Sequence, residues 1–178
     1  AAWVRCFGDT AKMAANVKAD KEGRIVEVNL SACSHMKELP ASVGKLKALT
    51  KLDLGRCRGL TSLPPELGGL QALTELWLNG CQGLTSLPPE LGGLQALTEI
   101  NLKYCSGLTS LPAELGGLQA LTQLDLWSCS GLTSLPDLSG LEKLKVINLP
   151  EALKPWEEGG RKARLDGMSE AARGANNA

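Results

Sequence analysis

The sequence predicts an α/β solenoid, in which short units stack side by side and wind in a right-handed arc. We expect a parallel sheet on the concave side and short helical or 3₁₀ segments on the convex side. Two observations predict this class. The segment LTSLPPELGGLQALTELWLNGCQG at residues 60–83 returns almost unchanged at residues 84–107. A cysteine also recurs every 24 residues, at Cys33, Cys57, Cys81, Cys105 and Cys129. A fixed period of this length is typical of stacked repeats.

The strand of each unit is predicted by an alternation of apolar and other residues just before the cysteine. In LTELWLNGC, Leu76 and Leu78 should point inward while Glu75 and Trp77 point outward, as the two-residue period of a strand requires. The same pattern occurs six times over residues 25–152. The last unit, LKVINLPEA, comes one residue early and has Ala152 where the cysteine would fall.

The return path of each unit is predicted from the stretch GLTSLPPELGGL. Its leucines should face the core from the convex side. Pro88 and Pro89 suit the first turn of a short helix or 3₁₀ segment, and Gly92 and Gly93 should end it. The leucines in question are Leu84, Leu87, Leu91 and Leu94.

The two ends are expected to cover the stack, because a solenoid must shield its terminal units. Residues 1–24 are predicted to form an N-terminal cap, with a short helix over AKMAANV followed by a hairpin into the first repeat strand. Residues 153–178 are predicted to form a C-terminal cap, with Leu153 and Trp156 as its lid, and a mobile tail.

The repeated unit resembles a known family. It fits L-x-x-L-x-L-x-x-(N/C)-x-L, the pattern of leucine-rich repeats. The cysteine at the ninth position and the LP pair at the sixteenth resemble the repeats of plant intracellular disease-resistance receptors. The resemblance covers residues 25–150 and implies the fold, but one fold serves many functions. The nucleotide-binding motif G-x-x-x-x-G-K-[ST] does not occur in the sequence.

Composition argues against several classes of function. The formal net charge of the 178 residues is zero, so the basic excess of a nucleic-acid-binding protein is missing. No apolar run is long enough for a membrane span. A single histidine leaves little material for acid–base or metal chemistry, so we expect no catalytic residues, no metal and no cofactor.

The five recurring cysteines are predicted to be structural thiols. Metal sites favour clustered spacing such as C-x-x-C, and these cysteines come one per unit. Neighbouring thiols lie within disulfide distance, but their parallel Cβ directions oppose a bridge. We expect each cysteine to face the core and take the place of the asparagine that hydrogen-bonds neighbouring backbone. Unbridged thiols favour a reducing, intracellular compartment.

The candidate binding site lies where the units differ. Only six aromatic residues occur in the chain, and three of them, Trp77, Tyr104 and Trp127, occupy outward positions of consecutive units. Aromatic side chains rimmed by charge are favoured at protein interfaces. The predicted rim consists of Lys51, Asp53, Arg56, Glu75, Glu99, Lys103 and Asp125.

The leading hypothesis is therefore a non-catalytic module that binds a protein partner through its concave face. The alternative is a structural or accessory subunit that uses its edges or tail within a larger assembly. An enzyme is the third class, and the sequence shows no constellation of nucleophile and base for it. The identity of the partner and the oligomeric state do not follow from the sequence.

Overall fold

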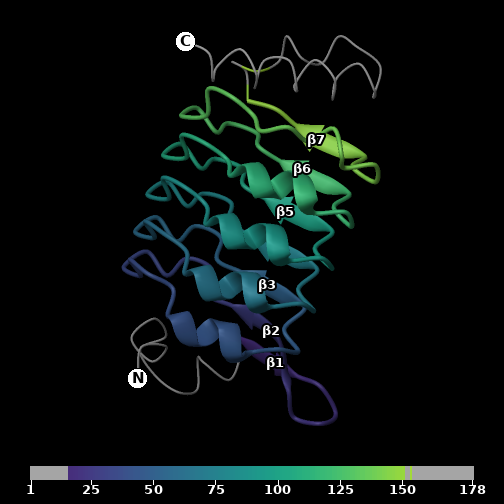
Figure 1. Cartoon of the computed structure of the whole chain (residues 1–178). Coiled ribbons are helices and arrows are strands. Elements are labelled where there is room, and N and C mark those ends of the chain that lie inside the picture. The colour runs from purple at the N-terminus through teal and green to yellow at the C-terminus, as the bar shows by residue number, and fades with distance from the viewer. Residues whose placement is uncertain (1–15, 151–152, 154–178) are drawn as a thin grey trace.

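The computed structural model describes residues 16–150 and 153, and within them it contains one seven-stranded sheet whose strands follow in chain order. Strands β2 to β7 are parallel, and β1 pairs antiparallel with β2. Figure 1 shows the strands stacked in one column and the short helical segments in a second column beside them. The strands are β1 (Val17–Ala19), β2 (Ile25–Asn29), β3 (Lys51–Asp53), β4 (Glu75–Trp77), β5 (Glu99–Asn101), β6 (Gln123–Asp125) and β7 (Val146–Asn148).

The register of the parallel strands places equivalent positions of the units side by side. Leu52 pairs with Leu76, which pairs with Ile100, and all three side chains are fully buried. The leucines of the return path also reach the core, since Leu84 and Leu91 are fully buried. The predicted inward faces are thus confirmed, and burial of this leucine core is the main driving force for the stack.

The return path contains 3₁₀ segments where the sequence left open a helix or a 3₁₀ turn. Pro88 precedes η3 and Pro89 opens it, as predicted. In the last return path, which is one residue shorter, residues 137–140 form no such segment. The segments are η1 (Ala41–Lys45), η2 (Pro65–Gly69), η3 (Pro89–Gly93) and η4 (Ala113–Gly117).

η3 ends at Gly93, as predicted, whereas Gly92 lies inside the segment and has a further role. A Cβ atom added at Gly92 would lie 2.6 Å from the Glu114 carbonyl oxygen of the next unit. Glycine is needed because consecutive 3₁₀ segments approach each other through their backbones.

The predicted N-terminal hairpin is confirmed. Strand β1 pairs with β2, and the turn between them is closed by the Asp20 carboxylate, which accepts hydrogen bonds from the backbone N–H groups of Glu22 and Arg24. Gly23 has a φ of 77° there. The predicted helix over AKMAANV, Trp156 and the tail lie outside the described residues, whereas Leu153 is buried as expected of a lid.

Two ladders of side chains join each unit to the one before it. Each cysteine from Cys57 to Cys129 donates its Sγ–H to a leucine carbonyl oxygen of the preceding unit, with Sγ···O distances of 3.0–3.2 Å. The backbone-bonding role predicted for the cysteines is thereby confirmed. The second ladder was missed: the hydroxyls of Thr74, Thr98 and Thr122 donate to the carbonyl of the equivalent threonine one unit earlier, at 2.9–3.0 Å. The recurring LT pair was its signal in the sequence.

Candidate functional site

The strand face consists of the side chains at the third and fifth positions of each unit, counted so that the cysteine of LTELWLNGC is the ninth. Its third position reads Glu27, Lys51, Glu75, Glu99 and Gln123, and its fifth reads Asn29, Asp53, Trp77, Asn101 and Asp125. The lysine of β3 is neutralised within this face, because Lys51 Nζ lies 2.6 Å from Glu75 Oε2. The structure thus brings most of the predicted charged rim onto one continuous surface.

The fifth position has a structural task as well. In Asp53, Asn101 and Asp125 a side-chain oxygen accepts a hydrogen bond from the backbone N–H two residues further on, at 2.8–3.2 Å. Aspartate and asparagine readily form such turns, and here the turns end the strands. Asp53 and Asp125 therefore shape the surface in addition to charging it, a role that the sequence analysis did not assign.

Trp77 replaces the turn-forming residue at this position and lies differently from the prediction. Its side chain is only partly exposed, because Lys51 Nζ lies 3.5 Å from the centroid of its ring. Its Nε1 is buried and has no hydrogen-bond partner among the described residues. The ring thus packs on the strand face under a lysine instead of projecting freely into solvent.

The turn edge is the row of turns that follow the strands: Arg56, Asn79, Gly80, Lys103, Tyr104, Trp127 and Ser128. Its eighth-position residues have left-handed backbones, with φ of 61° at Arg56, 75° at Gly80, 61° at Tyr104 and 59° at Ser128. Glycine adopts this conformation without strain, whereas other residues in it cost about 1 kcal/mol or more. Arg56 and Tyr104 therefore adopt a backbone conformation that is unfavourable for residues with a side chain.

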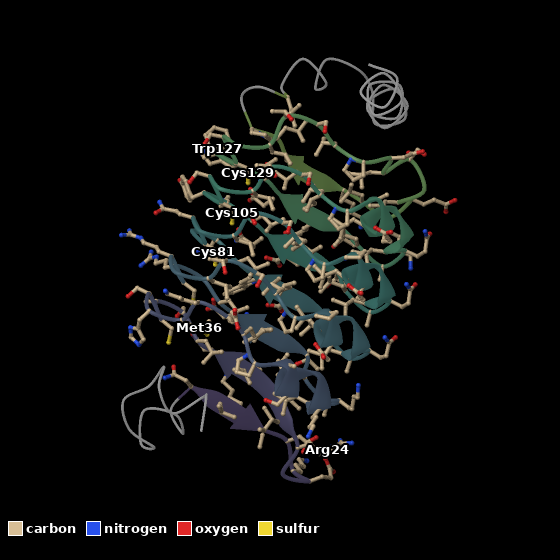
Figure 2. The ribbon with its side chains drawn as sticks, turned by 60° about the vertical axis from the view of Figure 1, so that its left-hand side comes forward. Arg24, Met36, Cys81, Cys105, Trp127 and Cys129 are labelled. Atoms are coloured by element: carbon tan, nitrogen blue, oxygen red, sulfur yellow. The ribbon has the colours of Figure 1, made fainter. Side chains whose placement is uncertain are left out.

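Tyr104 and Trp127 are the exposed large hydrophobic side chains of the described part of the chain, with 54% and 43% of their surface accessible. They are neighbours, since the Tyr104 N–H donates to the Trp127 carbonyl at 2.8 Å. Figure 2 shows Trp127 at the border of the stack, on the side where Cys81, Cys105 and Cys129 line up. The three predicted aromatic residues are thus divided between two adjoining surfaces, because β5 and β6 end before Tyr104 and Trp127.

The turn edge is braced by one carboxylate. Asp125 Oδ2 lies 3.0 Å from Lys103 Nζ and accepts a hydrogen bond from Asn148 Nδ2 at 2.8 Å. Asp125 Oδ1 accepts from the Trp127 N–H at 3.1 Å. The two aromatic residues accordingly rise from a backbone that hydrogen bonds hold in place.

The ladder thiols are poor nucleophiles. Burial raises the pKa of Cys105 to about 12 and that of Cys129 to about 11, and it raises the pKa of Cys81 further still. The neighbouring cysteines add to the shift at Cys81 and Cys105. Because the thiolate is the reactive form, these cysteines are suited to packing and hydrogen bonding.

Residues 16–150 and 153 contain neither a cluster of metal ligands nor a membrane-spanning helix. No group of three or more His, Cys, Asp or Glu side chains is arranged to hold a metal ion there. That part of the chain also contains no helix of the length and apolarity that crossing a bilayer requires.

Comparison with known proteins finds the same repeat and fold. The Leucine Rich Repeat family model matches residues 48–70 and 72–94. The leucine-rich repeat domain of the type III effector XopL is 31% identical, with a TM-score of 0.62, and the match covers 76% of this chain and 47% of that one. A leucine-rich repeat protein of Leptospira interrogans is 33% identical, with a TM-score of 0.50, over 78% of this chain and 39% of that one.

A more distant match shows the fold alone. The ectodomain of the receptor kinase SOBIR1 from Arabidopsis thaliana is 14% identical, with a TM-score of 0.50, over 75% of this chain and 77% of that one. No curated protein matches the sequence. The chain spans less than half the length of the effector and Leptospira structures that it resembles. The repeat pattern, the parallel sheet with its 3₁₀ segments and these matches show that the chain belongs to the leucine-rich repeat family.

Proposed function

We propose that this protein is a non-catalytic interaction module that binds a protein partner through its strand face and turn edge, with Tyr104 and Trp127 as anchors. The observation that carries the proposal is the exposure of these two neighbouring rings on a hydrogen-bonded backbone. Exposed tyrosine and tryptophan side chains are enriched at the energetic centres of protein interfaces. Proteins of this family commonly serve as interaction modules, which agrees with the proposal.

The place of Tyr104 in its turn supports the same function. Gly80 shows that glycine fits the eighth position, yet Tyr104 occupies it at a φ of 61° with more than half of its side chain exposed. The ring therefore contributes little packing in return for its strained backbone. The same φ recurs at Ala32, Arg56 and Ser128, so it belongs to the turn of each unit, and what distinguishes Tyr104 is a large exposed ring at this position.

The test separates binding from folding. Tyr104→Gly relieves the left-handed strain, so it should leave the free energy of unfolding unchanged within about 1 kcal/mol. It should nevertheless weaken partner binding about tenfold or more, as loss of an interface anchor does. Ser128→Gly is the matched control, because it changes the same position one unit away without removing a ring.

The experiment begins with crosslinking and capture of the partner, followed by affinity measurements with the purified partner and each variant. Binding that is unchanged in Tyr104→Gly and in Trp127→Ala, but is lost on removal of residues 154–178, would favour the accessory-subunit alternative. Weaker binding by Ser128→Gly than by Tyr104→Gly would show that the turn conformation matters and the ring does not.

We also propose that the protein works in a reducing compartment. The support is that none of the five ladder cysteines is in a disulfide and all are buried. In the purified protein they should react slowly with a thiol reagent until denaturant is added. A mass lower by two hydrogens per cysteine pair would show disulfides and contradict this proposal.

A further inference from the structure

The strand face holds a cavity of about 310 Å³ at its N-terminal end, apart from Tyr104 and Trp127. Its size is at the lower end of the range for small-molecule sites, which suits one inserted side chain. Strands β1 to β4 all contribute to its lining. The lining residues that bear on its chemistry are Lys18, Glu27, Asn29, Lys51, Asp53 and Trp77.

The charged lining residues are two lysines and two carboxylates, and a surplus negative charge arises once Glu75, the ion-pair partner of Lys51, is counted with them. Lys18 Nζ lies 2.6 Å from Glu27 Oε2, and Lys51 Nζ lies 2.6 Å from Glu75 Oε2, so both lysines are neutralised. Asp53 forms no ion pair with a described residue, and its Oδ1 already accepts from the Gly55 N–H. A negative charge therefore remains on the cavity wall.

A second such carboxylate stands two strands away. Glu99 pairs in register with Glu75 and likewise forms no ion pair with a described residue. Asp53 is the register partner of Trp77, so the two carboxylates lie on either side of β4. Neighbouring strands are about 4.8 Å apart and a strand rises about 3.3 Å per residue, so two strands and an offset of two residues separate the backbones at Asp53 and Glu99 by about 12 Å.

The ring between these carboxylates already accepts a cation. The Lys51 ammonium lies 3.5 Å from the centroid of Trp77, a cation–π contact. Such contacts are worth about 0.5–1 kcal/mol at exposed sites and more when water is excluded. The aromatic ring and the surplus of carboxylates are complementary to positively charged side chains.

We propose that the part of the strand face formed by β3, β4 and β5 binds a basic segment of the protein partner, with one arginine or lysine side chain in the cavity beside Asp53 and a second beside Glu99. The inference rests on the proposed function and names the chemistry of its partner. An acidic segment, which would need to displace Glu27 or Glu75 from its lysine, is the competing occupant.

The probe follows from the spacing of the carboxylates. An extended peptide advances about 3.4 Å per residue and its side chains alternate between two faces, so arginines four residues apart point to the same face and span about 13 Å. The probe is acetyl-Gly-Arg-Gly-Gly-Gly-Arg-Gly-amide, measured by calorimetry at low ionic strength. One comparison peptide carries citrulline, which has the shape of arginine without its charge. A second carries glutamate in place of arginine.

Variants are chosen from residues that the chain itself uses at the same positions. Asp53→Asn retains the turn, because Asn29 and Asn101 form it too. Glu99→Gln copies Gln123, and Trp77→Asn copies Asn101 without changing the charge. Glu90→Gln, on the exposed side of η3, is the control for net charge.

Asp53→Asn and Glu99→Gln should each weaken binding of the arginine peptide about two- to fivefold. Trp77→Asn should do the same, and Glu90→Gln should have less than a twofold effect. Circular dichroism verifies the fold of each variant, and Trp77→Leu replaces Trp77→Asn if the latter is unfolded.

Equal affinity for the citrulline peptide, tighter binding of the glutamate peptide, or an equal loss in Glu90→Gln would overturn the inference. The two proposals fail separately. If the arginine peptide does not bind while the partner still depends on Tyr104 and Trp127, the inference alone is wrong. If the peptide binds as expected, but substitutions on the strand face and the turn edge leave the affinity for the partner unchanged, the proposed function is wrong.

Discussion

The buried cysteine ladder predicts that the protein loses stability steeply in alkali. In the folded chain the pKa values of Cys81, Cys105 and Cys129 lie above the ordinary value of 9.0, at about 11 for Cys129 and about 12 for Cys105. In the unfolded chain these thiols ionise near the ordinary value. Between pH 9.0 and about 11 the folded state therefore binds more protons than the unfolded state, so stability falls as the pH rises.

The size of the effect follows from the number of thiols. Each proton retained only in the folded state lowers the free energy of unfolding by about 1.4 kcal/mol per pH unit, so three thiols lower it by about 4 kcal/mol per unit. Below the ordinary value the thiol contribution is fully present and constant. A domain with about 5–15 kcal/mol of stability should thus approach unfolding near the upper end of the window.

The substitution Cys81→Asn isolates the ladder from the lysines, which also titrate in alkali. Asparagine keeps a donor for the Leu54 carbonyl oxygen, which Cys81 Sγ contacts at 3.1 Å, but has no proton to lose. The assay is urea unfolding followed by circular dichroism at a series of pH values. The slope of stability against pH should be smaller in the variant by about one third of the thiol contribution. Parallel slopes would refute the reasoning, because they would mean that Cys81 ionises alike in both states.

Three further substitutions test the packing of the units. Leu76→Asp buries an unpaired charge in the fully buried core and should unfold the stack, losing more than about 4 kcal/mol by thermal denaturation, whereas a folded variant would disprove the inward assignment. Gly92→Ala should cost about 1–3 kcal/mol in urea unfolding, since its Cβ would lie 2.6 Å from the Glu114 carbonyl oxygen. The control is Gly117→Ala, whose Cβ would lie 3.9 Å from its nearest neighbour. Equal losses of stability in the two variants would contradict the argument from close approach. Thr98→Val should cost about 1 kcal/mol of stability, because it loses the 3.0 Å hydrogen bond to the Thr74 carbonyl. Unchanged stability in the same assay would mean that the threonine ladder does not stabilise the fold.

The fold was predictable because the same pattern of apolar and polar residues recurs in each unit. The alternation in LTELWLNGC predicted which side chains face the core, and its six occurrences predicted the number of units. The 24-residue spacing of the five cysteines predicted the register of the units that carry them. A single weak signal repeated five or six times becomes a strong one. The roles of the threonine hydroxyls and of Gly92 were missed because both depend on contacts between units, which the pattern within one unit does not show.

The candidate site was predicted in composition but not in arrangement. Counting outward positions identified Trp77, Tyr104 and Trp127, and the structure confirms large exposure for Tyr104 and Trp127. The partial burial of Trp77 depends on the Lys51 side chain of the preceding strand, which is 26 residues away in the sequence. The left-handed backbone of the turn edge was also missed, because Ala32, Arg56, Tyr104 and Ser128 are not residues that mark such a conformation.

The central claim is that the strand face and turn edge bind the partner and the 3₁₀ side does not. Its most direct test is the affinity of the purified partner for two folded variants. One carries Tyr104→Gly with Trp127→Ala, and the other carries Gln at Glu66, Glu90 and Glu114, which are exposed on the 3₁₀ side. The account predicts that the aromatic variant loses about a hundredfold in affinity and that the glutamine variant stays within about threefold of wild type. The reverse order, with the glutamine variant losing binding and the aromatic variant keeping it, would contradict the account.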